Sequence, residues 1–349
     1  MRFYNRPHRH YCGIDLHVKM MYLCILDATG QVLLHRNIAT APEAFLTAVA
    51  PCREDLVVAV ECMFTWYWLA DLCAEQGITF VLGHALAMKA IHGGKAKNDR
   101  IDAHKIAGLL RGGLLPQSYV YPAAMRATRD LLRRRLHLVR KRGQLLAHIQ
   151  NTRAQYNLPA FERRLAYPAN REGVSLQFPD PSVRKSVEVD LALIDQYDVL
   201  IADLEQMLVR EAKCDDPDAF HRLRSVPGIG PILALTILYE IHHIGRCDRV
   251  QEFAAYARLV TCAHQSAGKT LGTGGAKMGN VHLKWAFSEA AVLFLRHAHA
   301  APVATFMARL EKHHGKGKAL SILAHKIGRA VYFMLARNTV FSMPTFLAT

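Results

Sequence analysis

Residues 56–61 read Leu-Val-Val-Ala-Val-Glu, a short run of apolar and mostly β-branched side chains that ends on an acid. A run of this length without polar alternation is typical of a strand that is buried on both faces of a sheet. Helical patterns flank it, one from about Pro42 and one over Trp66 to Gln76, and a further strand is expected from Ile78 to Leu82. This alternation predicts a sheet that packs against helices.

Three more strands are expected before this run, at Tyr11 to Asp15, Met21 to Asp27 and Gln31 to Ile38. After it comes a Gly- and Lys-rich loop, and Asp99 then opens a helix that runs to about Leu110. Three sequential strands followed by alternating helix and strand predict a mixed α/β sheet domain over residues 1–118.

Residues 119–215 are expected to form a helical linker region. From Arg126 to Arg142 there are eight Lys or Arg residues and one acid, Asp130, while leucine or valine recurs every seven residues. A second heptad pattern runs from Ile194 to Leu208. Two interpretations stay open, a helical hairpin within one chain and a coiled coil between chains.

Residues 216–349 are predicted to be mostly helical. The segment Leu223 to Pro231 resembles a helix-hairpin-helix, in which the backbone around Gly228 and Gly230 contacts a nucleic-acid phosphate; the alternative is a tight turn between packed helices. Residues 265–279 are rich in glycine and lysine and are expected to be a loop that approaches a phosphate chain, with Lys269 and Lys277 neutralising its charge.

The composition restricts the function classes. The 349 residues are 51% hydrophobic and carry a net charge of +15, so the chain is globular and its field attracts polyanions, of which nucleic acid is the commonest and an anionic membrane surface the rival. No run is long and apolar enough to predict membrane insertion, and the basic N-terminus is no secretory signal. The eight scattered cysteines indicate reduced thiols and a cytoplasmic protein.

Four acids stand out in this basic chain: Asp15, Glu61, Asp99 and Asp102. The first two end predicted strands, and the D-x-x-D pair shares one face at the start of a helix. Gathered carboxylates repel one another unless a divalent cation neutralises them, and two Mg²⁺ ions about 4 Å apart suit phosphodiester cleavage. In the alternative interpretation Asp15 ends a strand, Asp99 caps its helix, and the other two make surface ion pairs.

The order of strand-end Asp, strand-end Glu and helical D-x-x-D resembles the ribonuclease H-like nucleases of the RuvC type. Over nearly the whole chain, G-I-D-L-H (13–17), K-N-D-R-I-D (97–102), V-P-G-I-G-P (226–231) and Q-S-A-G-K (265–269) together resemble the DEDD transposases of bacterial insertion sequences, the IS110 type. The resemblance implies a RuvC-like domain, a coiled-coil linker and a C-terminal transposase domain with a catalytic serine. The four acids would be the DEDD set, binding Mg²⁺, and Ser266 would be the nucleophile.

Family resemblance also implies partners. Donor and target DNA would be recombined under the guidance of a structured RNA encoded by the element. Because recombination requires at least two active sites, a dimer or tetramer is expected, and no membrane is expected as a partner. The basic helix would contact the nucleic-acid backbone. The residues expected to do so are Arg129, Arg133, Arg134, Arg140 and Lys141.

The favoured hypothesis is a transposase with a composite site of metal-binding acids and Ser266. Judged by composition alone, a serine in such a loop is more typical of a turn than of a nucleophile. A second hypothesis is a metal-dependent junction endonuclease without a serine intermediate. A third is a scaffold that binds nucleic acid and catalyses nothing.

Overall fold

The computed structural model describes residues 2–91, 98–212, 216–275, 278–297 and 301–348. The chain forms two compact units, residues 1–124 and 125–349. The helical linker predicted at residues 119–215 therefore lies mostly within the second unit, together with the C-terminal helices. The bounds of the three predicted domains remain a prediction.

The first unit is built on a five-stranded sheet with the order β4-β3-β2-β5-β6. The first three strands pair antiparallel, and β5 and β6 run parallel to β2. This mixed sheet is confirmed, and it fits a ribonuclease H-like domain. The strands are β2 (His10–Leu16), β3 (Met20–Asp27), β4 (Val32–Ala39), β5 (Leu56–Glu61) and β6 (Thr79–Gly83).

Helices cover both faces of the central strands. Cys12 and Ile14 of β2 point to one face, where they pack in a core with α1 (Pro42–Val49) and α2 (Tyr67–Glu75). Val57 and Ala59 of β5 point to the other face, toward α4 (Asp99–Arg111). Because β5 is buried on both faces, its apolar run lacks polar alternation.

Short elements complete this unit. They are β1 (Phe3–Tyr4), which pairs with β7 (Leu115–Pro116), the helix α3 (Ala85–Ile91) and the 3-10 turn Ala50–Cys52. None of them was predicted, because two-residue strands and one- or two-turn helices have too few residues to show a period.

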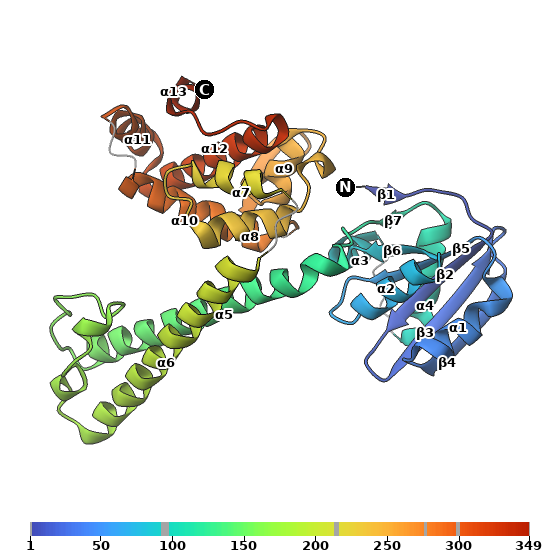
Figure 1. Cartoon of the computed structure of the whole chain (residues 1–349), viewed down its shortest axis with the longest axis horizontal. Coiled ribbons are helices and arrows are strands. Elements are labelled where there is room, and N and C mark those ends of the chain that lie inside the picture. The colour runs from blue at the N-terminus through green and yellow to red at the C-terminus, as the bar shows by residue number, and fades with distance from the viewer. Residues whose placement is uncertain (1, 92–97, 213–215, 276–277, 298–300, 349) are drawn as a thin grey trace. The chain divides into compact units, whose positions relative to one another are not determined.

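The second unit begins with two long helices, α5 (Ala123–Gln155) and α6 (Pro181–Glu211), which run side by side in opposite directions (Figure 1). Cross-helix ion pairs join them, among them Arg135 with Glu205 and Arg142 with Asp198. Buried leucine and isoleucine side chains fill the seam. The two heptad patterns therefore pair within one chain. A coiled coil between chains is not tested by this arrangement.

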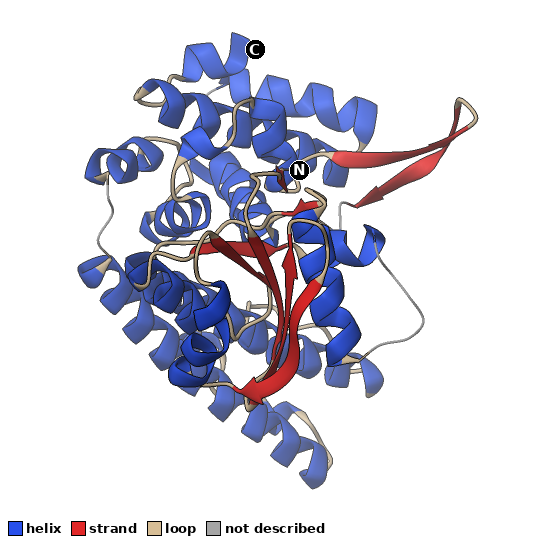
Figure 2. Cartoon of the chain, turned by 90° about the vertical axis from the view of Figure 1, so that its right-hand side faces the viewer, coloured by secondary structure: helices blue, strands red, loops and turns tan. Residues whose placement is uncertain are grey.

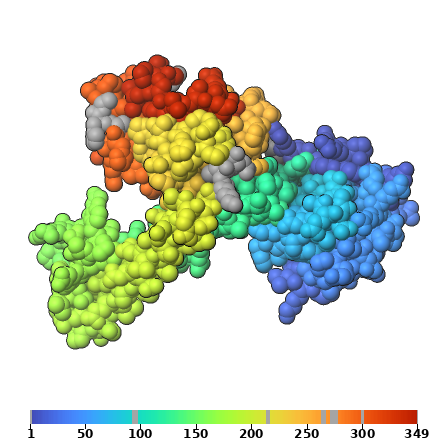
Figure 3. Space-filling view, in the orientation of Figure 1, coloured from blue at the N-terminus to red at the C-terminus, as the bar shows by residue number. Residues whose placement is uncertain are grey.

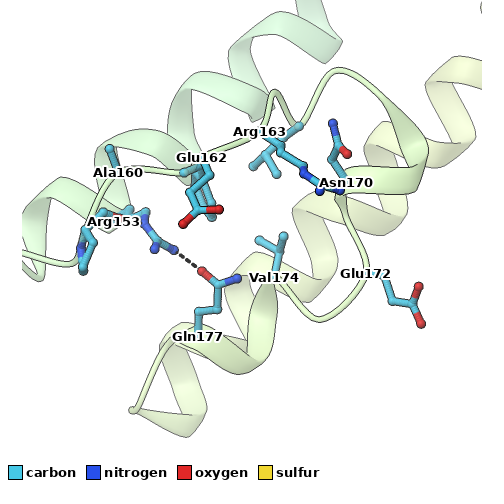
Figure 4. A pocket seen from close by; sticks show the side chains of 11 residues that line it. Arg153, Ala160, Glu162, Arg163, Asn170, Glu172, Val174 and Gln177 are labelled. Atoms are coloured by element: carbon cyan, nitrogen blue, oxygen red, sulfur yellow. Dashed lines mark hydrogen bonds between the residues drawn. The ribbon is translucent and has the colours of Figure 1, made fainter.

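The connection between these helices closes the outer end of the hairpin. It contains the 3-10 turns Pro168–Asn170 and Ser175–Gln177 and lines a cavity of about 360 Å³ (Figure 4). The Arg153 side chain in this cavity donates to the Gln177 side chain and stacks 4.0 Å over the Phe161 ring. The Arg153 guanidinium is thus bound by residues of the fold itself, and the cavity does not by itself indicate a ligand.

The remaining helices share one large apolar core. In it α12 packs Leu323, Ile327 and Val331. Within the described residues, α12 is the one helix long and apolar enough to cross a membrane, and 44% of its apolar window is buried inside the protein. We interpret it as a core helix. The elements are α7 (Pro217–Arg224), α8 (Pro231–Ile241), a 3-10 turn (Ile244–Arg246), α9 (Val250–Tyr256), α10 (Val281–His297), α11 (Ala301–His314), α12 (Lys316–Arg337) and α13 (Met343–Ala348).

A β-hairpin extends from these helices (Figure 2). Its strands are β8 (Thr261–Ser266) and β9 (Lys269–Gly275), which pair antiparallel. The prediction of a loop over residues 265–279 was therefore wrong for most of its length. The many glycines of this segment concealed the strand pattern, because glycine carries little strand propensity.

Candidate active site

Two of the four acids lie at the same edge of the sheet. In the parallel pair of β2 and β5, Ile14 is opposite Val60, so the next residues along, Asp15 and Glu61, are at the same level of neighbouring strands. Side chains alternate along a strand, and neighbours in register point to the same face. Asp15 and Glu61 therefore point to the α4 side, beyond Gly13 and Ala59.

The other two acids come from the first turn of α4. Gly13 lets this helix lie directly on β2, because a Cβ there would come within 2.4 Å of the Ala103 carbonyl oxygen. Asn98 caps the helix by accepting a hydrogen bond from the backbone nitrogen of Ile101 at 2.8 Å. Since Asn98 is the cap, Asp99 is not needed for that role, contrary to the alternative interpretation.

Asp15 interacts electrostatically with each of the other three acids. The pKa of Asp15 is raised above its ordinary value, first by burial and then by the negative charges of Asp99, Asp102 and Glu61, whereas His17 lowers it. Like charges at one site disfavour ionisation of each other. The structure thus brings all four predicted acids to one site.

Two basic side chains, a histidine and a lysine, join this site. His17 Nε2 lies 3.4 Å from Asp15 Oδ1 and 3.7 Å from Asp99 Oδ1. Lys105 Nζ lies 3.4 Å from Asp102 Oδ1. Neither residue was among those predicted from the sequence for this site. The signal for His17 was present in G-I-D-L-H, two positions after Asp15 at the strand end.

The donor set fits a divalent cation. One ligand atom from each of Asp15, His17 and Asp99 lies within 4.8 Å of the others. Carboxylate oxygens are the preferred ligands of Mg²⁺ and Mn²⁺, and a cation would remove the repulsion that raises the pKa of Asp15. Asp99 is half exposed and Asp15 is 21% exposed, so the site is open to solvent.

Ser266 is the last residue of β8. It pairs with Lys269 across the two-residue turn Ala267-Gly268, whose residues have φ of 47° and 75°. Positive φ at both positions is the signature of the tight hairpin turn. Ser266 is therefore beside the hairpin tip. Lys269 is exposed there, and Lys277 lies outside the described residues.

The predicted nucleic-acid residues of α5 divide into two groups. Arg134, Arg140 and Lys141 are exposed and make no ion pair within the described part of the chain. Arg129 is 8% exposed, and both it and Arg133 donate to the Glu240 carboxylate. The prediction of a backbone contact does not fit Arg129, because the contact would leave a buried carboxylate without its partner.

The two glycines of the Val226 to Pro231 turn differ. A Cβ on Gly228, whose φ is +85°, would lie 2.4 Å from the backbone nitrogen of Phe294 in α10, so this glycine is required for packing. Gly230 is exposed, precedes α8 and has open space around it. Two helices, α7 and α8, are joined by a turn here. A contact of Gly228 and Gly230 with a phosphate remains a prediction.

Comparison with known families adds to this geometry. Residues 12–157 match the transposase family of the DEDD IS110 type, and residues 220–306 match the family described as transposase IS116/IS110/IS902. The chain belongs to the IS110-type family of insertion-sequence transposases. The predicted resemblance is thereby confirmed.

Two similar proteins are also described as transposases. This IS110-type transposase is 25% identical over 337 residues to the transposase for insertion sequence element IS1111A of Coxiella burnetii, covering 94% of this chain and 90% of the relative. It is 27% identical over 282 residues to a probable family 20 transposase of Pseudomonas aeruginosa, covering 78% and 80%. It is a DNA transposase, and as a DEDD-type enzyme it uses a divalent metal.

Proposed function

We propose that this transposase cleaves and rejoins donor and target DNA at a composite site of four acids and Ser266, guided by a structured RNA. The observation that carries this proposal is the meeting of Asp15, Glu61, Asp99 and Asp102 at one edge of the sheet. Such a cluster is costly to hold together without a cation, and therefore favours a functional role over a structural one.

The acids would hold Mg²⁺ and present it to the scissile phosphate. A bound Mg²⁺ supplies positive charge to the phosphate oxygens as negative charge builds up in the transition state. Asp15 and Glu61 come from adjacent rigid strands, and Asp99 and Asp102 from a helix packed tightly on β2. Rigid elements of this kind keep ligand positions fixed, which electrostatic catalysis requires.

Ser266 would act as the nucleophile. Its Oγ would attack the phosphorus, forming an Oγ–P ester as the bond from phosphorus to a deoxyribose oxygen breaks, and the hydroxyl proton would pass to that leaving oxygen. In rejoining, a deoxyribose hydroxyl would attack the same phosphorus and return the proton to serine. The ester conserves the bond energy, so the exchange needs no ATP.

Two observations support Ser266. It stands beside a tight turn at the tip of a β-hairpin, where residues 267–269 are exposed and the backbone can approach DNA. The segment also lies within residues 220–306, which match the second transposase family. The acids and the serine belong to different units of the chain. The composite site would therefore combine them within one chain or from different subunits.

The outer face of α5 supports a nucleic-acid partner. Arg134 and Lys141 are seven positions apart and lie on the same helical face, with the exposed Arg140 beside it. Unpaired cations in a row attract a phosphate backbone. In the proposal this partner is the guide RNA or the DNA, and sequence specificity comes from base pairing.

Oligomerisation is supported by the outer face of α6. Val189, Leu193, Leu200 and Met207 are each 40% or more exposed and recur at heptad spacing. α6 lies at the surface along its length (Figure 3). An exposed apolar stripe on a long helix favours association, and recombination needs at least two active sites. We expect a dimer or tetramer located in the cytosol.

The decisive experiment is the Ser266→Ala variant with Ser288→Ala as its control. Ser288 is an exposed serine of α10 that donates to its own helix, at the Lys284 carbonyl oxygen. With a duplex that spans the element's end and the RNA transcribed from its flank, Ser266→Ala is expected to abolish covalent protein–DNA adducts and to retain DNA binding. Ser288→Ala is expected to form adducts at the wild-type rate. Adducts that persist in Ser266→Ala contradict the proposal.

The two alternatives give different products. A junction endonuclease without a serine intermediate would leave free DNA ends and no protein attached to them. A scaffold would retain its full activity in Asp15→Asn and Asp102→Asn. End-group analysis of the cleaved strands separates these outcomes from transposition through serine.

A further inference from the structure

A buried polar cluster in the second unit is centred on Glu240 of α8, which is 2% exposed. Arg129 of α5 donates to Oε2 at 2.9 Å and Arg133 donates to Oε1 at 2.6 Å. Asn280 donates through Nδ2 to Oε2 at 2.7 Å. One carboxylate therefore binds side chains from α5 and from the start of α10.

This cluster includes the root of the β8–β9 hairpin. Tyr256 is the last residue of α9, before the hairpin, and Asn280 directly precedes α10, after it. The Asn280 backbone nitrogen donates to the Tyr256 carbonyl oxygen at 2.6 Å, and its Nδ2 donates to the Tyr256 hydroxyl at 3.2 Å. The two ends of the hairpin segment are thus fastened to each other and to Glu240.

Two further contacts tighten the root. Arg258 Nε donates to the Gly279 carbonyl oxygen at 2.9 Å. Gly279 has a φ of +102°, and a Cβ there would lie 2.6 Å from the Tyr256 carbonyl oxygen. Only glycine allows the two chain segments to approach this closely. Asn280 also caps α10 by accepting from the Leu283 backbone nitrogen at 3.1 Å.

Stability alone does not explain why the Glu240 carboxylate is buried. A buried ion pair is often no more stabilising than apolar residues of the same size, whereas it fixes geometry through directional hydrogen bonds. Here the directional bonds run from α5, whose exposed face carries the unpaired cations, to the root of the hairpin that carries Ser266 beside its tip. Glu240 therefore lies between the two.

We propose that Glu240 is a positioning residue that fixes the serine-bearing hairpin relative to the α5 helix. This inference rests on the proposed function, because it gives the position of the hairpin a role in strand cleavage. Nucleic acid bound along α5 would then be held at a set distance from the hairpin tip. Without the hydrogen bonds of this cluster, α5 would still bind nucleic acid, but Ser266 would be displaced from its position relative to α5.

The test compares Glu240→Gln and Tyr256→Phe with Glu205→Gln in the full-length protein. Glu205 of α6 pairs with Arg135 of α5 and, among the described residues, makes no hydrogen bond or ion pair with the hairpin root, so it controls for the loss of an α5 ion pair. Tyr256→Phe keeps the aromatic ring, whose centroid lies 4.7 Å from Arg246 Cζ, and removes only the hydroxyl. If Glu240→Gln fails to fold, this milder variant still tests the role of the cluster.

Amide hydrogen exchange of residues 261–275 is measured first, without DNA. We expect exchange at least tenfold faster in both cluster variants and unchanged exchange in Glu205→Gln. The single-turnover rate of adduct formation on the duplex described above is expected to fall at least tenfold, with the equilibrium affinity for the same duplex changed less than threefold.

Two results would overturn the inference. One is hairpin exchange in Tyr256→Phe that matches Glu205→Gln. The other is faster exchange with an unchanged rate of adduct formation. A failure of the serine assignment is recognised separately, because adducts would then persist in Ser266→Ala, while the exchange measurement does not depend on Ser266.

Discussion

A methyl group on Gly13 would lie 2.3 Å from the backbone nitrogen of Ala107, so strand β2 and helix α4 touch at this point without a side chain between them. Real Cβ atoms do not approach backbone this closely. The contact places the first turn of α4 beside the end of β2, where Asp15 is located. Close packing of strand and helix thus determines how near the acids come to one another.

Gly13→Ala tests this relationship. The added methyl group must push α4 away from β2, and we expect the free energy of unfolding to fall by about 2 kcal/mol. Gly108→Ala, on the same helix, is the matched control because a Cβ there meets no atom within 4 Å. Gly108→Ala should be neutral or stabilise the helix by up to about 1 kcal/mol. Equal unfolding midpoints in the two variants would contradict the argument.

Metal binding should stabilise the first unit through the acids. We expect Mg²⁺ to raise the unfolding temperature, with about 2.7 kcal/mol gained at a concentration one hundred times its Kd. Asp15→Asn and Asp102→Asn should lose most of this gain, because each removes a charge that the cation neutralises. Glu43→Gln, at an exposed position in the first turn of α1, should keep it. The measurement is thermal unfolding with and without the ion.

His17 should contribute a nitrogen ligand when Mn²⁺ replaces Mg²⁺. Its Nε2 is 3.4 Å from Asp15 Oδ1, and imidazole binds transition metals better than it binds Mg²⁺. Pulsed electron paramagnetic resonance of the Mn²⁺ protein should show coupling to a nitrogen nucleus. The coupling should disappear in His17→Ala and persist in His104→Ala, an exposed histidine of α4. Coupling that survives in His17→Ala would exclude this role.

The sheet was predictable because its strands carry strong patterns. The run Leu56 to Glu61 is apolar since both of its faces are covered, and the structure has this strand at the predicted bounds. The acids could be named individually, because each ends a strand or opens a helix. Their meeting could only be hypothesised, since it depends on the register of β2 with β5 and on the Gly13 contact.

The buried cluster on Glu240 could not have been predicted. Arg129 and Arg133 occur in a stretch with a single acid, and such a composition favours an exposed basic surface. Their partner is more than one hundred positions away along the chain, in a helix that is otherwise almost entirely apolar. Local patterns carry no information about such a distant pairing. Two of the five cations predicted on α5 are therefore paired inside the protein.

The exposed cations of α5 should control the salt dependence of DNA binding. Each phosphate contact adds about 0.9 to the slope of log affinity against log salt concentration on duplex DNA. Changing Arg134, Arg140 and Lys141 to glutamine should therefore lower the slope by up to about 2.7. Lys185→Gln on α6, where the lysine pairs with Glu188, should leave the slope unchanged. An unchanged slope in the triple variant would show that nucleic acid binds elsewhere.

Stability should fall in mild acid because of His282. Burial is the main reason why the pKa of His282 is lowered from 6.5 to about 4. Between these values the unfolded chain binds more protons than the folded one, so stability is lost as the pH falls from 6.5 to 4. With allowance for solvent screening the loss is about 2 kcal/mol.

The lowered pKa of Glu240 affects stability at lower pH than the pKa of His282 does. Burial opposes the charge of this carboxylate, but the hydrogen bond from Arg133 and the charge of Arg129 outweigh it, so its contribution is lost only below about pH 4.5. Urea unfolding between pH 7 and pH 5 therefore reports on the histidines whose pKa is lowered by burial, which are His282 and His325 in the described part of the chain. His282→Gln should make the profile less steep in this range and leave the share of His325, whereas His313→Gln, at an exposed position on α11, should retain the full slope. A wild-type profile in His282→Gln would mean that another group releases its proton on folding, because only a group with a lowered pKa produces this sign.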